Sequence, residues 1–225
     1  MNWKEFWNNK AVEQNPSAQV ARIKSGEPIS RELLQMIADK IILQLELKST
    51  DEVLDVCCGN GMLSSLLANH CKSIDGIDLS SNQIQQAKKN NTQSNVSYYE
   101  GNAIDFNLNK KYDKILLYFS FQYFDQKGEG EKAIQNLLQH SKSNCIILIG
   151  DIPDSNRKIY YFPNFIELLK YSLKRILNKS DMGKFWSKKE MEGICNSLNV
   201  QGHFMKQESW QPYSHYRFDY FIFAN

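Results

Sequence analysis

The sequence predicts an α/β fold in which a mostly parallel sheet is covered by helices on both faces. Between residues 52 and 151, short apolar runs of strand length alternate with segments whose apolar residues recur at helical spacing. These runs are apolar on both faces, as in strands that are fully covered. The last two runs have no helix between them, so they should pair antiparallel. Together, these patterns predict a doubly wound sheet with an antiparallel end.

The expected elements follow in order along the chain. A helix is expected over 29–47, where apolar residues have helical spacing and Ser30 can cap the first turn. Strands are expected over 52–58, 73–79, 95–101, 112–121 and 144–151, and helices over 62–70, 81–90 and 131–141. After Asp151, a helix over 165–177 interrupts the alternation, and a helix over 187–198 and strands over 200–208 and 216–223 complete it.

Composition excludes several classes of function. The net charge is +2 and no dense run of Lys and Arg occurs, so neither a nucleic acid nor a membrane is expected as partner. No apolar run approaches about 20 residues, and the N-terminus lacks the apolar core of a secretory signal, so we expect a cytoplasmic protein. The five cysteines are irregularly spaced, which indicates neither a disulfide framework nor a metal site.

The stretch "LDVCCGNG" (54–61) follows the first expected strand and opens a helix. Ligands of open α/β sheets bind beyond the carboxyl ends of the strands, and glycine there allows close approach or positive φ. A P-loop would end in Gly-Lys-Ser or Gly-Lys-Thr, which is absent. The dinucleotide pattern would need a third glycine at position 64, where Ser64 stands. The glycines therefore point to a ligand other than a pyrophosphate.

Polar residues also end the next two strands. A carboxylate at Asp78 can accept hydrogen bonds from both hydroxyls of a ribose. In "EGNA" (100–103), an amide side chain and a backbone N–H could contact the edge of an adenine. Each feature alone also suits a strand-end turn or a solvated acid. The three consecutive strand ends together predict a nucleoside.

These motifs make residues 51–151 resemble the class I S-adenosylmethionine-dependent methyltransferases. The first family motif, acid-x-Gly-x-Gly-x-Gly, corresponds to Asp55 through Gly61, with Cys57 in place of the first glycine. This departure suggests that Cys57 has negative φ and turns its thiol away from the ligand. The resemblance implies a seven-stranded sheet, the cofactor S-adenosyl-L-methionine and the product S-adenosyl-L-homocysteine. The implied cofactor-binding residues are Asp55, Cys57, Gly59, Gly61, Asp78, Leu79, Asn102, Ala103, Leu117 and Gln122.

The sequence gives less information about the residues that would bind the methyl acceptor. Asp151, His215 and Tyr123 are the candidate catalytic residues, although a structural role is an open alternative for each. Aromatic residues over 118–124 would suit the positive charge of a sulfonium. Arg22 and the bases at 170, 174 and 175 suggest an anionic acceptor, unless they belong to a solvated face.

We therefore expect a single methyltransferase domain over 1–225. Its parts would be an N-terminal helical cap (1–50), a cofactor-binding core (51–151), a helical insertion or lid (155–182) and a C-terminal helix with an antiparallel strand pair (183–225). The expected reaction moves a methyl group to oxygen or nitrogen of a small molecule, such as a sugar or another bacterial metabolite. One alternative is a non-catalytic partner protein that binds S-adenosylmethionine or a nucleoside. An NAD-dependent oxidoreductase is disfavoured by the missing third glycine.

Overall fold

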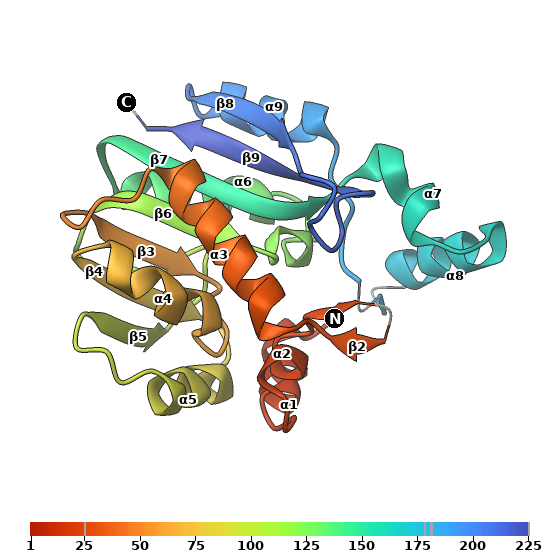
Figure 1. Ribbon diagram of the computed structural model, residues 1–225. Coiled ribbons are helices and arrows are strands. Elements are labelled where there is room, and N and C mark those ends of the chain that lie inside the picture. Colours follow the sequence, from red (N-terminus) through yellow and green to blue (C-terminus); the bar gives the residue numbers. More distant parts are fainter. Residues whose placement is uncertain (25, 178, 181, 225) are drawn as a thin grey trace.

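A seven-stranded sheet forms the centre of the computed structural model, which describes residues 1–24, 26–177, 179–180 and 182–224 (Figure 1). Its order is β5-β4-β3-β6-β7-β9-β8. The strands are β3 (Glu52–Val56), β4 (Ser73–Asp78), β5 (Val96–Glu100), β6 (Tyr112–Tyr118), β7 (Ser141–Pro153), β8 (Gln201–Lys206) and β9 (Arg217–Phe223). Strands β3 to β7 run parallel, whereas β9 is antiparallel to both β7 and β8. The expected doubly wound sheet with an antiparallel end is confirmed.

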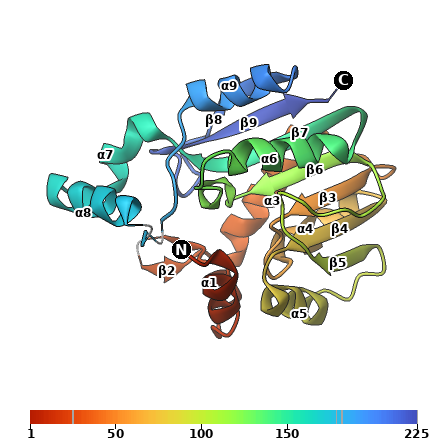
Figure 2. The ribbon, with the colours of Figure 1, turned by 180° about the vertical axis from the view of Figure 1, so that it is seen from behind.

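Helices cover both faces of the sheet (Figures 1 and 2). On one face, α3 (Arg31–Leu45) and α4 (Met62–Leu67) bury apolar side chains against the sheet, and α5 (Ser81–Asn90) packs beside β5. On the other, α6 (Glu129–Gln139) and α9 (Lys188–Ser197) pack on the largest core cluster. The short 3₁₀ turns are η1 (Ala68–His70), η2 (Phe121–Tyr123) and η3 (Ser155–Arg157). None of the described helices is long and apolar enough to cross a bilayer.

The connections between strands change direction along the sheet at β3, which lies between β4 and β6. Strand β3 pairs with β4 on one side and with β6 on the other, so the connections leave it in opposite directions. Such a reversal leaves a crevice beyond the strand ends, where α/β proteins bind ligands. The strand expected over 112–121 ends earlier, at Tyr118, because Phe119 has φ +67° and breaks the extended backbone.

The N-terminal segment lies over this crevice and begins with two short helices. Helix α1 (Trp3–Lys10) is followed by α2 (Pro16–Gln19) and by a hairpin of β1 (Ile23–Lys24) and β2 (Glu27–Pro28). The break falls at Pro16, which opens α2, while Asn15 accepts hydrogen bonds from the backbone of its first turn.

Helices α7 (Lys158–Tyr161) and α8 (Phe165–Ile176) project from one end of the molecule (Figure 1). We call residues 155–177 the arm. Tyr171 of α8 packs with Phe185 and Tyr216, and its hydroxyl donates a hydrogen bond to the carbonyl of Gly183 (2.8 Å). An aromatic cluster therefore helps to attach the arm to the body.

Candidate functional site

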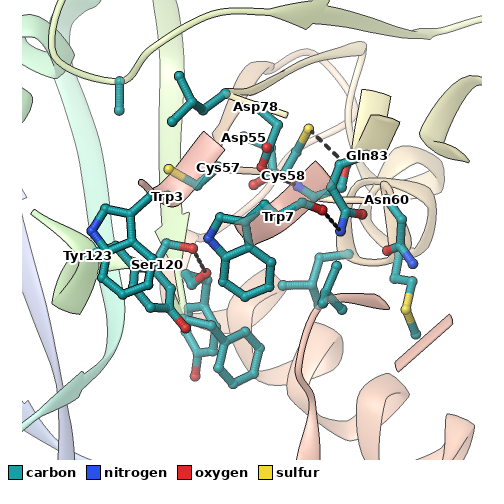
Figure 3. A pocket seen from close by; sticks show the side chains of 18 of the residues that line it. Trp3, Trp7, Asp55, Cys57, Cys58, Asn60, Asp78, Gln83, Ser120 and Tyr123 are labelled. Atoms are coloured by element: carbon teal, nitrogen blue, oxygen red, sulfur yellow. Dashed lines mark hydrogen bonds between the residues drawn. The ribbon is translucent and has the colours of Figure 1, made fainter. Parts of the chain in front are cut away.

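A cleft lies at the carboxyl ends of β3, β4 and β6, under the N-terminal segment (Figure 3). Its wall contains residues from the loop after each strand, from α1 and from the chain that follows α2. Of the expected cofactor-binding residues, the cleft is lined by Asp55, Cys57, Gly59, Asp78, Leu79, Asn102 and Ala103. Of the expected catalytic residues, Tyr123 lines it.

The loop after β3 turns sharply into α4 through left-handed backbone. Cys57, Gly59 and Gly61 have φ values of +61°, +56° and +76°. The expectation of negative φ at Cys57 is therefore wrong, because the loop keeps the left-handed path that a glycine would take there. That conformation costs a residue with a Cβ roughly 1–2 kcal/mol. At Gly59, an added Cβ would lie 2.7 Å from Cγ1 of Val20, so this position also has no room for a side chain.

The Cys57 thiol lies in the cleft wall, yet its environment makes it unreactive. Burial raises the pKa of this thiol well above its ordinary value, and the carboxyls of Asp78 and Asp55 raise it further. The thiol therefore stays protonated at neutral pH, and the thiolate is the reactive form. Among the described residues, no cluster of three His, Cys, Asp or Glu side chains could hold a metal ion.

The carboxylate of Asp78 ends β4 and faces the cleft. Its Oδ2 accepts a hydrogen bond from the Gly59 N–H and its Oδ1 accepts one from the Ser80 N–H, both at 2.9 Å. A carboxylate has about four acceptor positions, so two remain for a ligand. Burial raises the pKa of Asp78 to about 6, although the two backbone hydrogen bonds oppose this shift. A diol placed here would supply the two donors that the carboxylate can still accept.

Asp55 is the second carboxyl in the cleft wall. It lies in β3 and its Oδ2 accepts a hydrogen bond from the Ser64 hydroxyl at 2.6 Å. Burial raises its pKa to about 7, and the nearby Asp78 carboxyl adds to the shift. Two buried carboxyls close together make this part of the cleft favourable to a ligand with positive charge.

Three expected cofactor-binding residues are placed away from the cleft wall. Gly61 caps the N-terminus of α4 beside Tyr98, and Leu117 is buried in the main core. Gln122 is buried, and its side-chain N–H donates to the carbonyl of Phe119 at 2.8 Å. Gly61 and Gln122 thus shape the loops around the cleft. Their direct contact with a cofactor stays a prediction, as does that of Leu117.

Hydrogen bonds fix the N-terminal segment over the cleft. The Asn60 amide donates to the carbonyl of Pro16 (2.9 Å) and to Oε1 of Gln19 (2.8 Å). From α5, the Gln83 amide donates to the Gln19 carbonyl at 2.7 Å. These contacts join α2 to the loop after β3 and to α5.

Three buried polar atoms at the cleft lack a hydrogen-bond partner within the described chain. They are the indole N–H of Trp3, Oδ1 of Asn60 and Oε1 of Gln83, and all three side chains line the cleft (Figure 3). A buried polar atom without a partner is costly, and it often marks a ligand position. One donor and two acceptors around one cavity suit a ligand that carries both kinds of group, such as an α-amino acid moiety.

Aromatic rings and one cation form the remainder of the cleft. The ring of Tyr123 packs against Trp3 and Trp7, with centroids 4.5 and 5.2 Å apart. The Cζ atom of Arg22 lies 3.1 Å from the ring centroid of Phe119. Burial lowers the pKa of Arg22 to about 10, so its guanidinium remains charged at neutral pH. Burial also raises the pKa of Tyr123, which keeps its hydroxyl protonated.

Asp151 is held in a network behind the cleft. Its Oδ2 accepts from Arg217 (2.9 Å) and its Oδ1 accepts from Gln207 (3.1 Å), while its N–H donates to Asp219 (2.9 Å). Arg217 also donates to the Asp151 carbonyl at 2.7 Å. The side chain is 2% exposed and is not among the described residues that line the cleft.

His215 lies outside the cleft wall as well. Its ring packs against Tyr216, with centroids 4.8 Å apart, and its exposed backbone carbonyl accepts from Arg157. Partial burial and the nearby cations Lys24 and Arg217 lower its pKa. The structure thus brings Tyr123 to the cleft and leaves Asp151 and His215 beside it. A catalytic role for any of the three stays a prediction.

Comparison with known proteins agrees with this geometry. Residues 53–144 match a family model described as "Methyltransferase domain". These residues form a methyltransferase domain, and the chain has the fold of methyltransferases solved with bound S-adenosyl-L-homocysteine. S-adenosylmethionine is the cofactor expected for such a domain.

The names of curated relatives refer to several different substrates. The malonyl-[acyl-carrier protein] O-methyltransferase of Acetivibrio thermocellus is 32% identical over 108 residues, which cover 47% of this chain and 37% of that protein. The ubiquinone biosynthesis O-methyltransferase of Rickettsia typhi is 27% identical over 173 residues, covering 75% of this chain and 67% of that protein. The chain spans about half the length of the first curated relatives that it matches.

Solved structures show the same fold. The N-methyltransferase NodS of Bradyrhizobium japonicum, in complex with S-adenosyl-L-homocysteine, has a TM-score of 0.64 at 16% identity, covering 100% of this chain and 99% of that one. The magnesium protoporphyrin IX methyltransferase of Synechocystis, with bound S-adenosyl-L-homocysteine, has a TM-score of 0.62 at 15% identity, covering 98% and 94%. The cleft of the present chain fits that cofactor, since the free acceptor positions of Asp78 suit a ribose and the unpartnered atoms suit its amino acid end.

Proposed function

We propose that this protein transfers a methyl group from S-adenosylmethionine to an oxygen or nitrogen atom of a small-molecule acceptor. The observation that carries the proposal is the buried Asp78 carboxylate. It accepts hydrogen bonds from two backbone N–H groups, so acceptor positions are left toward the cleft. The motif residues Gly59, Leu79 and Ala103 line the same cleft.

Each part of the cofactor would have its own contacts. Asp78 would accept both ribose hydroxyls, Leu79 would cover the adenine, and Asn102 with Ala103 would contact its edge. The free oxygens of Asn60 and Gln83 would accept from the ammonium group, and the Trp3 indole would donate to the carboxylate. When bound, S-adenosylmethionine supplies a methyl group on a sulfonium for in-line displacement.

The chain's own residues would position the acceptor and exclude water. The rings of Trp3, Trp7 and Tyr123 close one side of the cleft, and an aromatic face stabilises nearby positive charge. Enclosure of this kind replaces bulk water by fixed groups and holds the acceptor in line.

The ionisable groups of the cleft narrow the class of acceptor. The described carboxyls that line it are Asp55, Asp78 and Glu129, and its lining includes no His or Lys. Asp78 is assigned to the ribose, and Asp55 already accepts from Ser64. We therefore favour an acceptor that needs no base from the protein, namely an oxygen that is ionised before it binds. The Arg22 guanidinium on the Phe119 ring would attract such an oxyanion.

The names of two curated relatives agree with transfer to oxygen, since both are called O-methyltransferases. A nucleic-acid acceptor is less suitable because the net charge is only +2. The five cysteines are free, which supports a working place in the reducing cytoplasm.

Two measurements test the proposal. Thermal-shift titration with S-adenosylmethionine, S-adenosyl-L-homocysteine and NAD should stabilise the protein with the first two and leave it unchanged with NAD. Incubation with S-adenosylmethionine and pools of small organic acids, phenols and amines should then release S-adenosyl-L-homocysteine, most strongly with acids or phenols. Stabilisation by NAD alone would contradict the proposal.

A second candidate is a non-catalytic protein that binds S-adenosylmethionine. The observation that favours it is the position of Asp151, whose carboxylate is buried behind the cleft in an ion pair with Arg217 and does not line the cleft. This candidate predicts tight binding of the cofactor and no turnover with any acceptor pool.

A further inference from the structure

The arm presents apolar side chains to solvent along the whole length of α8. Large side chains remain exposed there, including Phe165 (70%), Ile166 (63%), Leu173 (60%) and Ile176 (77%). Leu169 and Leu177 are exposed in the same helical region, and Ile159 and Tyr160 are exposed on α7. Isolated exposed apolar residues are ordinary, but a contiguous group of this size marks an interaction surface.

Helical geometry places these side chains on one face. At about 100° per residue, Phe165, Ile176, Leu169, Leu173, Ile166 and Leu177 fall in that order within an arc of about 120°. We call these six residues the apolar face of α8. The opposite side of the helix attaches the arm to the body, through Tyr171 in the aromatic cluster and through Arg175, which forms an ion pair with Asp125. The apolar face is therefore not the face that α8 uses for its own packing.

Basic residues border the apolar face. Lys170 and Lys174 follow it directly around the helix, at about 140° and 180° on the same scale. Between residues 157 and 179 the chain has six bases and one acid, Glu167, which pairs with Lys170 at 2.7 Å. A helix with one apolar face and lysines at its border is typical of helices that lie in the surface of a bilayer with anionic lipids.

The composition of the face favours a lipid surface over a protein partner. Protein interfaces are on average only slightly more than half apolar, with hydrogen-bonding groups throughout. The apolar face of α8 has only hydrocarbon side chains, and its polar groups stand at the border. Lysine ammonium groups at that level can reach headgroup phosphates while the apolar side chains enter the acyl region.

We propose that the apolar face of α8 binds the surface of an anionic lipid bilayer. The arm would lie in the plane of the interface and the α/β body would remain in water. This surface was not expected from the net charge of +2, because that value averages the basic arm with the acidic remainder of the chain.

The arm also connects to the cleft. The backbone N–H of Lys184 donates to the carbonyl of Gln122 at 2.8 Å, and Gln122 precedes the cleft residue Tyr123. The segment that follows the arm is thus joined to the cleft wall. A bilayer bound at α8 would therefore hold the cleft at a fixed place relative to the lipid surface.

Vesicle sedimentation tests this proposal with the full chain. The protein is mixed with vesicles of phosphatidylcholine alone or with 30% phosphatidylglycerol, and the pelleted fraction is measured at low and high salt. The wild type should pellet with the anionic vesicles, less at high salt, and weakly with the neutral ones. The double variant Ile166→Glu/Leu173→Glu should reduce the partition coefficient at least tenfold, and so should Lys170→Glu/Lys174→Glu.

A control variant distinguishes binding through the arm from binding through any exposed apolar side chain. Leu43 on α3 is 73% exposed, so Leu43→Glu makes the same chemical change outside the arm and should sediment like the wild type. Unchanged thermal unfolding would show that each variant folds. Failure of the wild type to pellet would overturn the proposal, as would equal loss in Leu43→Glu. A wild-type dimer that the Ile166→Glu/Leu173→Glu variant converts to monomer, without vesicle binding, would assign the face to a second copy instead.

Discussion

Asp78 and Asp151 make an instructive comparison, since both stand at the carboxyl edge of the parallel strands and both are buried. Asp78 accepts hydrogen bonds from two backbone N–H groups and lines the cleft. Asp151 accepts from the side chains of Arg217 and Gln207 and lies behind the cleft. An acid at a strand end can therefore bind a ligand only where its carboxylate faces the cleft and is not already paired with a cationic side chain.

The largest effect that we expect is the loss of stability when Asp151 is replaced by alanine. Asp151→Ala leaves the buried Arg217 guanidinium without its carboxylate, so the free energy of unfolding should fall by about 3–5 kcal/mol. Denaturant unfolding of the variant and the wild type measures the difference. The exposed acid Asp105 supplies the control, because Asp105→Ala should change stability by less than about 0.5 kcal/mol. If the Asp151→Ala protein kept its stability but had a much lower kcat, Asp151 would instead be a catalytic base.

The pH dependence of Asp78 should have opposite signs for stability and for binding. Burial raises its pKa from the ordinary 3.8 to about 6, so the folded protein binds more protons than the unfolded chain between these values. The free energy of unfolding should therefore decrease by about 2 kcal/mol as pH rises from about 4 to 6. Affinity for S-adenosyl-L-homocysteine should instead increase as pH rises through 6, because the ionised carboxylate accepts the ribose hydroxyls.

Asp78→Asn gives the control for that pH dependence. This substitution should remove the contribution of Asp78 to the pH dependence of stability and of S-adenosyl-L-homocysteine binding. It keeps the size of the side chain. A variant with the wild-type pH profile in calorimetric titration would contradict the assignment of the binding slope to Asp78.

Arg22 tests the acceptor half of the cleft. In Arg22→Ala, loss of one charge-assisted contact should lower kcat/KM for an anionic acceptor about 10- to 100-fold. Affinity for S-adenosyl-L-homocysteine should change less than threefold. Arg22→Lys should restore part of the activity, because it keeps the charge but not the planar guanidinium. Equal loss of cofactor and acceptor binding would place Arg22 at the cofactor carboxylate instead.

Substitutions of Cys57 should change the free energy of unfolding less than Asp151→Ala does. Cys57→Gly relieves left-handed strain of roughly 1–2 kcal/mol and removes a buried side chain, so its net change in stability should stay within about 1 kcal/mol. Cys57→Val places a β-branched residue at φ +61° and should destabilise the protein by about 2 kcal/mol or more. A Cys57→Val protein as stable as the wild type would show that the loop can take another path.

The sequence was most informative where a local pattern determines the structure. Ser30 caps α3 as expected, since its side chain accepts from the backbone of Leu33. Asp78 reaches the cleft because it ends β4, and the parallel pairing of β3 to β7 agrees with the alternation of elements. The break before Pro16 also had a local signal, because Asn-Pro at a helix start is a capping pattern.

The remainder depends on pairs that are distant in sequence. The engagement of Asp151 requires Gln207 and Arg217, which come from the end of the chain. The stacking of Arg22 on Phe119 depends on how the N-terminal segment closes over β6. Periodicity and spacing do not encode such contacts, so the function of each residue could not be assigned before the fold was known.

Calorimetric titration of an Asp78→Ala protein with S-adenosyl-L-homocysteine tests the central claim most directly. Two lost charge-assisted hydrogen bonds, each about 1.5–3 kcal/mol, predict an affinity lower by at least about 100-fold. The Asp105→Ala protein should bind like the wild type, and unfolding curves should confirm that both variants are folded. A folded Asp78→Ala protein with wild-type affinity would contradict the account.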